Sequence, residues 1–493
     1  MAGALSEIPA HLRRFVVEQD YGQYTESDQA VWRFVLARLS SSLNERAHPA
    51  YKHGLAATGI RLDRIPSIAE MNDKLGRFGW GAVAVDGFIP PRAFQEFQAA
   101  GILPIAAEIR TSEHVEYTPA PDIIHEAAGH APILPEPTFA AYLRRIGEVG
   151  AQAFTVPADA AVYTAIYELS EVKERPDATA EEVERAERAL AEALANGTVV
   201  SEAARLSRLY WWTAEYGLFG TPEQYTLYGA GLLSSIGESR SCHATEVRKL
   251  PLDEGCVEVD YDITRPQPQL FVTPDFETLH AVLDRVAEGL AVRRGGAYAL
   301  RTALESRELA TLRFSSGAIA IGVLARVLGP FDAPWAVELS GPVGFGWDGR
   351  LLPEHFPNAH ADCWVIVGRL ADGSSPDTGL VGASPSSRRT SIEFVSGARV
   401  EGRIVRREGL PDGRTACLEL EAARIVLPRS APRELARFTL LCAGDFVTAR
   451  AGAADGAYHG ETQYSGVRVP RPRPNRASTR SAASAPPPGP STH

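Results

Sequence analysis

The sequence has few cysteines and no long apolar segment, and both absences narrow the class of protein. The cysteines are odd in number and scattered, with no Cys-x-x-Cys pair: Cys242, Cys256, Cys363, Cys417 and Cys442. This gives no support to a disulfide framework or a zinc knuckle and fits a reducing compartment. No apolar run approaches the ~18 residues of a membrane span, and the first residues lack the apolar core of a signal peptide. We therefore expect a cytoplasmic protein that does not enter a membrane.

An excess of positive charge is also missing. The chain carries a net charge of −11, which argues against a general nucleic-acid or anionic-membrane surface. Its 493 residues are too many for one ordinary domain, and a hydrophobic fraction of 45% allows most of the chain to bury a core. We expect two or three domains and no nucleic-acid partner.

The most informative segment is Pro121-Asp-Ile-Ile-His-Glu-Ala-Ala-Gly-His130, because it places two histidines five residues apart. Neutral imidazole is a good ligand for Fe, Zn, Cu and Ni. On a regular α-helix five residues span about 500°, so the two rings would point about 140° apart. We therefore expect a short helix that carries His125 and ends at Gly129, with His130 just past its end. The spacing differs from the His-Glu-x-x-His of zinc proteases.

A metal bound by this pair needs further ligands, and the sequence offers many carboxylates. Two histidines and one carboxylate on one face of an octahedron leave three positions open, as in non-haem Fe(II) oxygenases. Spacing alone does not separate the candidates: Asp122, Glu168, Glu171, Glu202 and Glu215. The last of these lies among aromatic residues, where a buried charge is costly unless a metal balances it.

Three sequence blocks resemble the pterin-dependent aromatic amino acid hydroxylases and lie in that family's order. They are Tyr117-Thr-Pro-Ala-Pro-Asp-Ile-Ile-His125, Leu209-Tyr-Trp-Trp-Thr-Ala-Glu-Tyr-Gly-Leu218 and Tyr228-Gly-Ala-Gly-Leu-Leu-Ser-Ser-Ile-Gly-Glu238. The resemblance covers roughly residues 20 to 290. It implies a predominantly helical non-haem iron hydroxylase catalytic domain that contains short strands. After about residue 300 an alternating pattern predicts a β-rich C-terminal domain, and together the two parts give an α+β fold class.

The resemblance implies an Fe(II) site formed by His125, His130 and Glu215. Glu215 is selected because it lies in the block that resembles the family's ligand helix. Tyr210 resembles the tyrosine that the family keeps near the iron, where it tunes the reaction.

A tetrahydropterin, either tetrahydrobiopterin or a related pterin, is the implied co-substrate. Glu126 resembles the glutamate that binds the pterin ring, and a carboxylate suits the N–H-rich edge of that ring. Phe94 is expected to stack on the ring, with Phe97 as the alternative.

For the amino-acid substrate, Arg110 lies fifteen residues before His125, as does the family's carboxylate-binding arginine. A guanidinium group binds a carboxylate through two parallel hydrogen bonds. The other residues implied in substrate binding are Thr118, Pro121, Trp211, Tyr216, Gly231, Ser234 and Ser235. The family most often has Phe at the position of Tyr216, and this departure leaves the choice of substrate open.

The implied activity is that of a phenylalanine 4-monooxygenase-like enzyme, which converts L-phenylalanine to L-tyrosine with O2 and a reduced pterin. The alternatives are the same chemistry on tryptophan or on a non-protein aromatic amino acid. From other classes come a zinc-dependent hydrolase, for which the histidine spacing is wrong, and a binding module that acts through the C-terminal half. The oligomeric state is not predicted.

The domain boundaries expected from the sequence are 1–300 for the catalytic domain, 301–469 for a β-rich accessory domain and 470–493 for a disordered tail. A helical insertion is expected at about 157–207, with an amphipathic surface helix within 177–197. Alternating patterns predict strands at 391–395, 399–405 and 417–426, with a hairpin turn at Ser396-Gly397. His355 and His360 are also five apart and are interpreted as loop residues, without a second metal.

Overall fold

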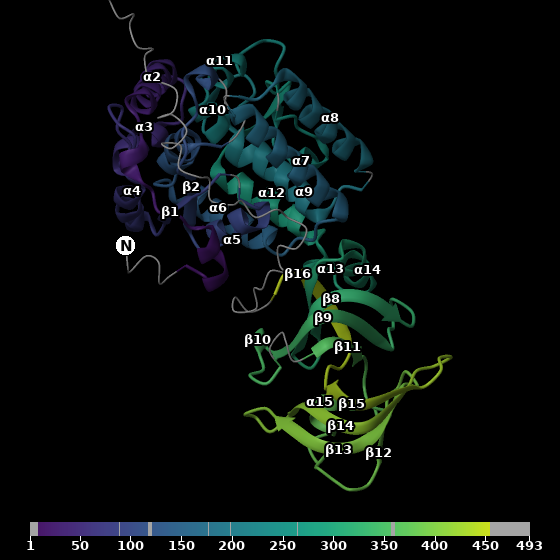
Figure 1. Ribbon diagram of the computed structural model, residues 1–493. Helices are drawn as coiled ribbons and strands as arrows, with labels where there is room; N and C mark the ends of the chain where they lie inside the picture. The colour runs from purple at the N-terminus through teal and green to yellow at the C-terminus, as the bar shows by residue number, and fades with distance from the viewer. Residues whose placement is uncertain are drawn as a thin grey trace, which may run out of the picture.

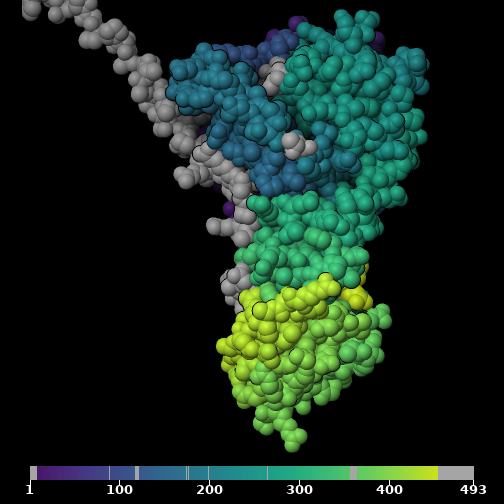
Figure 2. All heavy atoms as spheres, turned by 90° about the vertical axis from the view of Figure 1, so that its right-hand side faces the viewer, coloured from purple at the N-terminus to yellow at the C-terminus, as the bar shows by residue number. Residues whose placement is uncertain are grey.

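The chain folds into a body of helices followed by a region of β-sheets (Figure 1). The structure is a computed structural model, and it describes residues 8–87, 89–116, 121–175, 177–197, 199–263, 265–355 and 360–453. In the space-filling view the later residues, coloured green to yellow, form a lobe beneath the helical body (Figure 2). The tail expected at 470–493 lies outside the described residues.

Helices dominate the first part of the chain. The α-helices there are α2 (Glu26–Leu43), α3 (Pro49–Ala57), α4 (Ile68–Leu75), α5 (Pro91–Ala99), α6 (Pro137–Gly150), α7 (Pro157–Glu174), α8 (Ala180–Asn196), α9 (Glu202–Tyr210), α10 (Ala230–Ser234), α11 (Glu238–Ser241), α12 (Phe276–Glu288), α13 (Ala291–Arg294) and α14 (Gly296–Ser306). Two π-helices, η5 (Ile124–His130) and η7 (Trp211–Glu215), lie among them.

Strands are short in the first part and long in the second. The short strands are β1 (Gly81–Val85), β2 (Ile102–Ala106), β3 (Leu218–Gly220), β4 (Tyr225–Leu227), β5 (Arg248–Pro251) and β6 (Gln269–Thr273). The later strands are β7 (Leu309–Phe314), β8 (Ala318–Leu328), β9 (Ala336–Trp347), β10 (Arg350–Leu351), β11 (His360–Ile366), β12 (Thr390–Glu393), β13 (Arg399–Gly409), β14 (Thr415–Val426), β15 (Arg433–Leu441) and β16 (Phe446–Ala451). The expected α+β fold class is confirmed.

A β1–α5–β2 unit forms one side of the helical body. The two strands are parallel, and α5 connects them. Helix α5 begins with Pro91 in its first turn, and Gly101, with φ of +70°, follows its end, as capping preferences predict. Phe97 faces the core and is fully buried, whereas Phe94 on the same helix is only partly buried. The unit thus leaves Phe94 at the surface of a cavity described below.

Helices α7 and α8 pack against each other within the expected insertion. The predicted surface helix is confirmed as α8, which begins with a capping box between Thr179 and Glu182. Glu184 and Arg188, one turn apart on this helix, form an ion pair at 2.8 Å. The buried face of the helix does not reach its end, because Leu190 is 7% exposed but Leu194 is 55% exposed.

The β-rich region contains two antiparallel sheets. One has the order β10-β9-β8-β7-β16, with β11 also paired to β9, and the other has the order β12-β13-β14-β15. The predicted hairpin is confirmed, since β12 pairs with β13 and Gly397 adopts a φ of +83° between them. α15 (Pro376–Gly379) is a short turn of helix near β14.

Of the two histidines predicted to lie in loops, His360 departs from the prediction and His355 does not. His360 begins β11 and is not a loop residue, because the backbone there pairs with β9; its side chain is outside the described part. His355 lies in the turn after β10, but it is only 3% exposed. Its Nε2 is 2.8 Å from a carboxylate oxygen of Glu408.

Glu202 holds together segments of the helical body that lie next to the β-rich region. Its carboxylate accepts hydrogen bonds from the backbone N–H groups of Phe154, at 3.1 Å, and Ala291, at 2.6 Å. Arg92 reaches across to Glu308 at 2.6 Å. Glu202 is therefore a structural residue far from the histidine pair.

Within the described residues, no helix is both long and apolar enough to cross a membrane.

We expect Glu202→Ala to lower the free energy of unfolding by about 2 kcal/mol. The substitution leaves two buried N–H donors without an acceptor, and each such loss costs roughly 1–3 kcal/mol. Urea unfolding followed by tryptophan fluorescence measures the effect. Glu258→Ala is the control, because Glu258 pairs with Arg205 where both side chains are about half exposed. Equal effects of the two substitutions would contradict the role given to Glu202.

Candidate functional site

Both segments that carry the predicted metal ligands are π-helices. A π-helix closes its turns with hydrogen bonds between residues five apart. His125 and His130 therefore lie about one turn apart on η5, and their ring centroids are 5.0 Å from each other. The predicted helix end at Gly129 is wrong, because η5 continues through His130. A change of helix type, and not a break, brings the two rings together.

Gly129 has a packing role in place of the predicted terminal one. A Cβ atom at this position would lie 2.7 Å from the backbone oxygen of Ala230. Gly129 therefore lets α10 approach η5 closely, and this approach positions Ser234 beside the first histidine.

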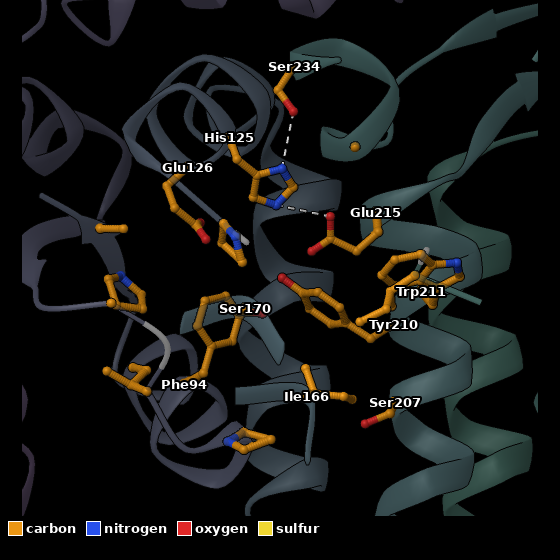
Figure 3. Close-up of a pocket in the computed structure, with 18 of the residues that line it drawn as sticks. Phe94, His125, Glu126, Ile166, Ser170, Ser207, Tyr210, Trp211, Glu215 and Ser234 are labelled. Carbon is orange, nitrogen blue, oxygen red and sulfur yellow. Dashed lines mark hydrogen bonds and ion pairs between the residues drawn. The ribbon is translucent and has the colours of Figure 1, made fainter. Parts of the chain in front are cut away.

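Glu215, the last residue of η7, points toward the ring of His125 (Figure 3). Its carboxylate oxygens lie 3.2 Å from Nε2 of His125 and 3.0 Å from Nε2 of His130. One ligand atom from each of the three residues lies within 4.8 Å of the other two. The structure thus brings together two imidazole nitrogens and one carboxylate.

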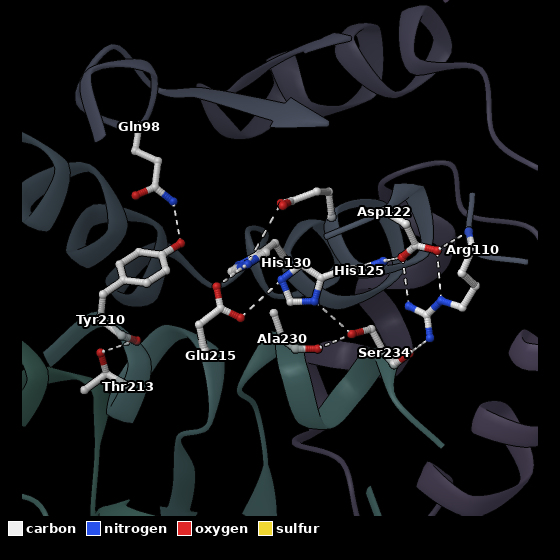
Figure 4. Close-up of polar contacts among 11 residues, drawn as sticks. Gln98, Arg110, Asp122, His125, His130, Tyr210, Thr213, Glu215, Ala230 and Ser234 are labelled. Atoms are coloured by element: carbon white, nitrogen blue, oxygen red, sulfur yellow. Dashed lines mark hydrogen bonds and ion pairs between the residues drawn. The ribbon is translucent and has the colours of Figure 1, made fainter. Parts of the chain in front are cut away.

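The hydrogen bonds around His125 determine which ring nitrogen can bind a metal. Its Nδ1 lies 3.1 Å from the hydroxyl of Ser234, and that hydroxyl donates to the backbone oxygen of Ala230 at 2.7 Å (Figure 4). Since the hydroxyl proton is used, Ser234 accepts the proton of Nδ1. The lone pair of Nε2 is then free to bind a metal on the side of Glu215.

The charges of the site favour a cation at its centre. Burial lowers the pKa of His125, but the carboxylate of Glu215 outweighs this and raises the pKa to about 9. Burial raises the pKa of Glu215, but the rings of His130 and His125 outweigh burial and hold this pKa far below its usual range. A bound metal ion would take the place of the proton as the balancing charge.

The other carboxylates considered from the sequence have different surroundings. Asp122 pairs with Arg110, and Glu202 accepts the two backbone hydrogen bonds described above. Glu168 and Glu171 lie on α7. Among the described residues, Glu215 is the carboxylate that clusters with the two histidines.

Arg110 and Asp122 form a buried ion pair beside the site (Figure 4). The guanidinium group donates two hydrogen bonds of 2.8 Å, from Nε and Nη2, to the Asp122 carboxylate. Asp122 also accepts from the backbone N–H of His125 at 3.0 Å. The remaining nitrogen, Nη1, lies 3.3 Å from the backbone oxygen of Ser234 and retains a second N–H. This nitrogen can still donate to a bound carboxylate.

A cavity of about 280 Å³ surrounds the predicted site. It is lined by the predicted residues Phe94, Arg110, Pro121, His125, Glu126, Tyr210, Trp211, Glu215, Tyr216, Gly231, Ser234 and Ser235. Two predicted residues are not in this lining. His130 contacts Glu215 but does not reach the cavity, and Thr118 lies outside the described residues. The alternative Phe97 is fully buried in a separate core.

One wall of the cavity is aromatic. Trp211 stacks on Tyr216, with ring centroids 4.6 Å apart, and on Tyr261, at 4.3 Å. A Cβ atom at Gly231 would lie 2.9 Å from the ring of Tyr216, so glycine leaves space for this ring. The wall suits a flat, apolar ligand.

The side of the cavity away from Trp211 carries Phe94 and Glu126, and Tyr210 lies between Phe94 and Trp211 (Figure 3). The rings of Phe94 and Tyr210 meet edge to face, and the Tyr210 hydroxyl accepts a 2.7 Å hydrogen bond from Gln98. Oε2 of Glu126 is buried, makes no hydrogen bond and lies 3.9 Å from Nε2 of His130, and burial raises the pKa of this carboxyl group. Glu126 therefore has capacity to bind a polar ligand.

Sequence reasoning missed several residues of the cavity, among them Ile166, Ser170, Ser207, Tyr261 and Ile263. Ser207 precedes Trp211 by four residues, and this helical spacing is a signal that could have indicated it. The others lie on α7 or in the segment after η8 (Glu254–Glu258), which no motif connects to the site.

Comparison with known proteins agrees with this geometry. The sequence profile of the family described as biopterin-dependent aromatic amino acid hydroxylase matches residues 17–180 and 191–299. The chain is 29% identical to the phenylalanine-4-hydroxylase of Mesorhizobium japonicum over 269 residues, covering 54% of this chain and 81% of the relative. It is 30% identical to that of Pseudomonas aeruginosa over 260 residues, covering 52% and 81%.

A solved structure of Chromobacterium violaceum phenylalanine hydroxylase, with bound iron(III) and 7,8-dihydrobiopterin, is 27% identical with a TM-score of 0.44. The match covers 57% of this chain and 89% of that one. The family profile matches more than half of the chain. The protein belongs to the biopterin-dependent aromatic amino acid hydroxylases. It is a phenylalanine 4-monooxygenase-like enzyme of aromatic amino acid metabolism.

We expect Asp122→Asn to lower the free energy of unfolding by about 3 kcal/mol near neutral pH, because it leaves the buried Arg110 without a counter-charge. Asp63→Asn is the control and should change little, since Asp63 and its partner Arg61 are both 59% exposed. Urea unfolding at several pH values measures both effects.

The pH dependence of this difference has a definite sign. Burial raises the pKa of Asp122, but Arg110 outweighs burial and lowers it from the usual 3.8. A lowered pKa in the folded state contributes stability that is complete above 3.8 and disappears as the pH falls through the folded value. The difference in the free energy of unfolding between wild type and Asp122→Asn should therefore become smaller as the pH falls. A difference that does not change with pH would contradict the ion pair.

Proposed function

We propose that the protein is an Fe(II)- and tetrahydropterin-dependent monooxygenase that converts L-phenylalanine to L-tyrosine with O2. The observation that carries the proposal is the group of His125, His130 and Glu215 at the wall of a partly aromatic cavity. Two imidazoles and one carboxylate are the ligand set of non-haem Fe(II) oxygenases and leave positions open for other molecules. A zinc hydrolase is the rival that metal analysis separates from it.

The residues present fit a bound iron ion. Ser234 leaves Nε2 of His125 available as a ligand, and Glu215 is ionised between the two rings. His125, His130 and Glu215 would hold the ion. Bound iron together with a reduced pterin supplies the activation of O2, and the chain provides the orientation and a cavity with limited water.

The residues opposite the aromatic wall fit a pterin. Oε2 of Glu126, which makes no hydrogen bond within the protein, can accept one from a ring N–H. Phe94 presents an aromatic ring to the same cavity, and Phe97 does not. Tyr210 lies between these residues and the metal ligands, with its ring centroid 6.2 Å from that of His130, which supports the tuning role proposed for it.

The other end of the cavity fits a free amino acid. Nη1 of Arg110 can donate to the substrate carboxylate, while Asp122 fixes the plane of the guanidinium group. The aromatic ring of the substrate would lie between Pro121 and the wall formed by Trp211 and Tyr216.

The hydroxyl group that distinguishes Tyr216 from the family's usual Phe interacts with Glu238. Burial raises the pKa of this buried carboxyl group to about 7, and the Tyr216 hydroxyl acts to lower it. The Tyr216 hydroxyl therefore has a polar group of the protein to interact with and does not depend on the substrate for one. This supports phenylalanine over a substrate that carries its own hydroxyl or indole N–H.

We further propose that residues 1–300 form the catalytic domain with a helical insertion at about 157–207, and that 301–469 form an accessory domain. The helical body has a large hydrophobic core of its own, which supports this division. Phe154 and residues of α13 and α14 pack instead into the core of the first sheet, so the two parts meet there. The cytoplasmic location that we propose is supported by the cysteines, all of which are free thiols.

We expect His125→Ala, His130→Ala and Glu215→Ala each to lose iron and to abolish tyrosine formation, because three ligands leave no spare one. Elemental analysis of iron-loaded protein and chromatography of the products measure the two effects. Glu168→Ala is the matched control on α7 and should retain both. Full iron content and activity in Glu215→Ala would refute the ligand assignment.

We expect Glu126→Ala to keep its iron but to raise the KM for the tetrahydropterin several-fold. A hydrogen bond to a polar ligand edge contributes roughly 0.5–1.5 kcal/mol. Initial rates at varied pterin concentration give the KM, with the exposed Glu223→Ala as control. Lost iron with an unchanged KM would show that Glu126 is a metal ligand.

We expect kcat/KM for phenylalanine to exceed that for tryptophan at least tenfold, a difference of about 1.4 kcal/mol. The indole of Trp211, fixed between two tyrosine rings, leaves more room for a one-ring substrate than for a two-ring one. Product analysis with each aromatic amino acid gives the ratio, and Trp211→Phe should shift it toward tryptophan. Equal or higher efficiency with tryptophan in the wild type would refute the argument.

A further inference from the structure

A second group of potential metal ligands lies in the β-rich region, away from the catalytic cavity. It consists of His355, Glu408 and Cys417, and one ligand atom of each lies within 4.8 Å of the others. His355 is 3% exposed and Cys417 is 1% exposed. The side chain of Glu408 is 16% exposed. The group is therefore largely removed from solvent.

Three segments fix the positions of these side chains. Glu408 on β13 is directly opposite Cys417 on β14, so both side chains lie on the same face of the sheet. His355 reaches them from the turn after β10. Its backbone N–H donates to Leu352 at 3.0 Å, and its backbone oxygen accepts from Phe345 at 3.2 Å. The strands β13 and β14 run through the lower part of Figure 1.

The three side chains match the charge of a divalent ion. Among the described residues, the carboxylate of Glu408 has one ion-pair partner, His355, at 2.8 Å. Arg406, two residues earlier on the same strand, pairs with Glu354 and Glu419. A neutral imidazole, a carboxylate and a thiolate carry two negative charges together, which a divalent ion balances.

The sulfur ligand distinguishes this group from the catalytic one. Burial raises the pKa of the Cys417 thiol well above its usual value, so the thiol is inert without a metal. A coordinated thiol loses its proton outright. Imidazole nitrogen, carboxylate oxygen and thiolate sulfur are the three ligand types that zinc uses in proteins.

A cavity adjoins the group and provides room for a further ligand. Its volume is about 360 Å³, and His355 forms part of its lining together with Cys363, Glu419, Arg433 and Arg437. Zinc sites with three protein ligands keep a fourth position for water or another small molecule. Water could reach an ion at His355 from this side.

We propose that His355, Glu408 and Cys417 bind a divalent ion of the zinc type, with a fourth coordination position open to this cavity. This site is separate from the proposed iron ligands His125, His130 and Glu215, which include no sulfur. Metal binding at His355, Glu408 and Cys417 would not require the proposed hydroxylase activity.

Cobalt(II) titration of the full-length, metal-free protein tests the proposal, because a cobalt–thiolate bond gives an intense near-ultraviolet charge-transfer band that nitrogen and oxygen ligands do not give. We expect two cobalt ions per chain and this band in the wild type. Cys417→Ser should bind one ion without the band. Cys363→Ser, in the lining of the same cavity, should keep both the band and the second ion, and Glu215→Ala should keep the band.

The band missing from folded wild type at saturating cobalt, or surviving in Cys417→Ser, would overturn the proposal. Circular dichroism reports whether each variant is folded. If Cys417→Ser does not fold, His355→Asn and Glu408→Gln decide the matter. Each should weaken the cobalt binding that produces the band at least tenfold, and unchanged affinity in both would overturn the proposal.

Discussion

The site depends on one constraint: two imidazoles five residues apart must face a single buried carboxylate. A regular α-helix would turn the rings about 140° apart, and the π-helix η5 removes this difference. The carboxylate of Glu215 ends a second π-helix and lies 3.0–3.2 Å from both rings. Helices of this type are rare and are often found at functional sites. Their geometry here explains why the ligands sit on helices and not on a loop.

The surrounding structure connects the two ends of the cavity. Asp122 pairs with Arg110, the proposed substrate residue, and also accepts the backbone N–H of His125, a proposed ligand. Ser234 accepts from the ring of His125, and its backbone oxygen lies 3.3 Å from Arg110. The substrate end and the metal end are therefore held by the same few groups, so that their separation is fixed before any ligand binds.

Much of this could be predicted from the sequence, where the signals are local. The alternating strands, the Ser396-Gly397 hairpin and the surface helix α8 follow from periodicity and capping. The helix end predicted near Gly129 was wrong, because propensity rules do not predict π-helices. Gly129 instead allows close packing against α10. Residues such as Tyr261 enter the site through tertiary contacts between distant segments, for which the sequence has no signal. The burial of His355 beside Glu408 has the same cause.

The most direct test of the central claim is the fate of oxygen in a single turnover. Iron-loaded protein is mixed with tetrahydropterin, L-phenylalanine and isotopically labelled O2, and the product is analysed by mass spectrometry. The account predicts tyrosine that contains one labelled oxygen atom, formed together with oxidised pterin. Absence of tyrosine, or tyrosine with oxygen from water, would contradict a monooxygenase built on His125, His130 and Glu215.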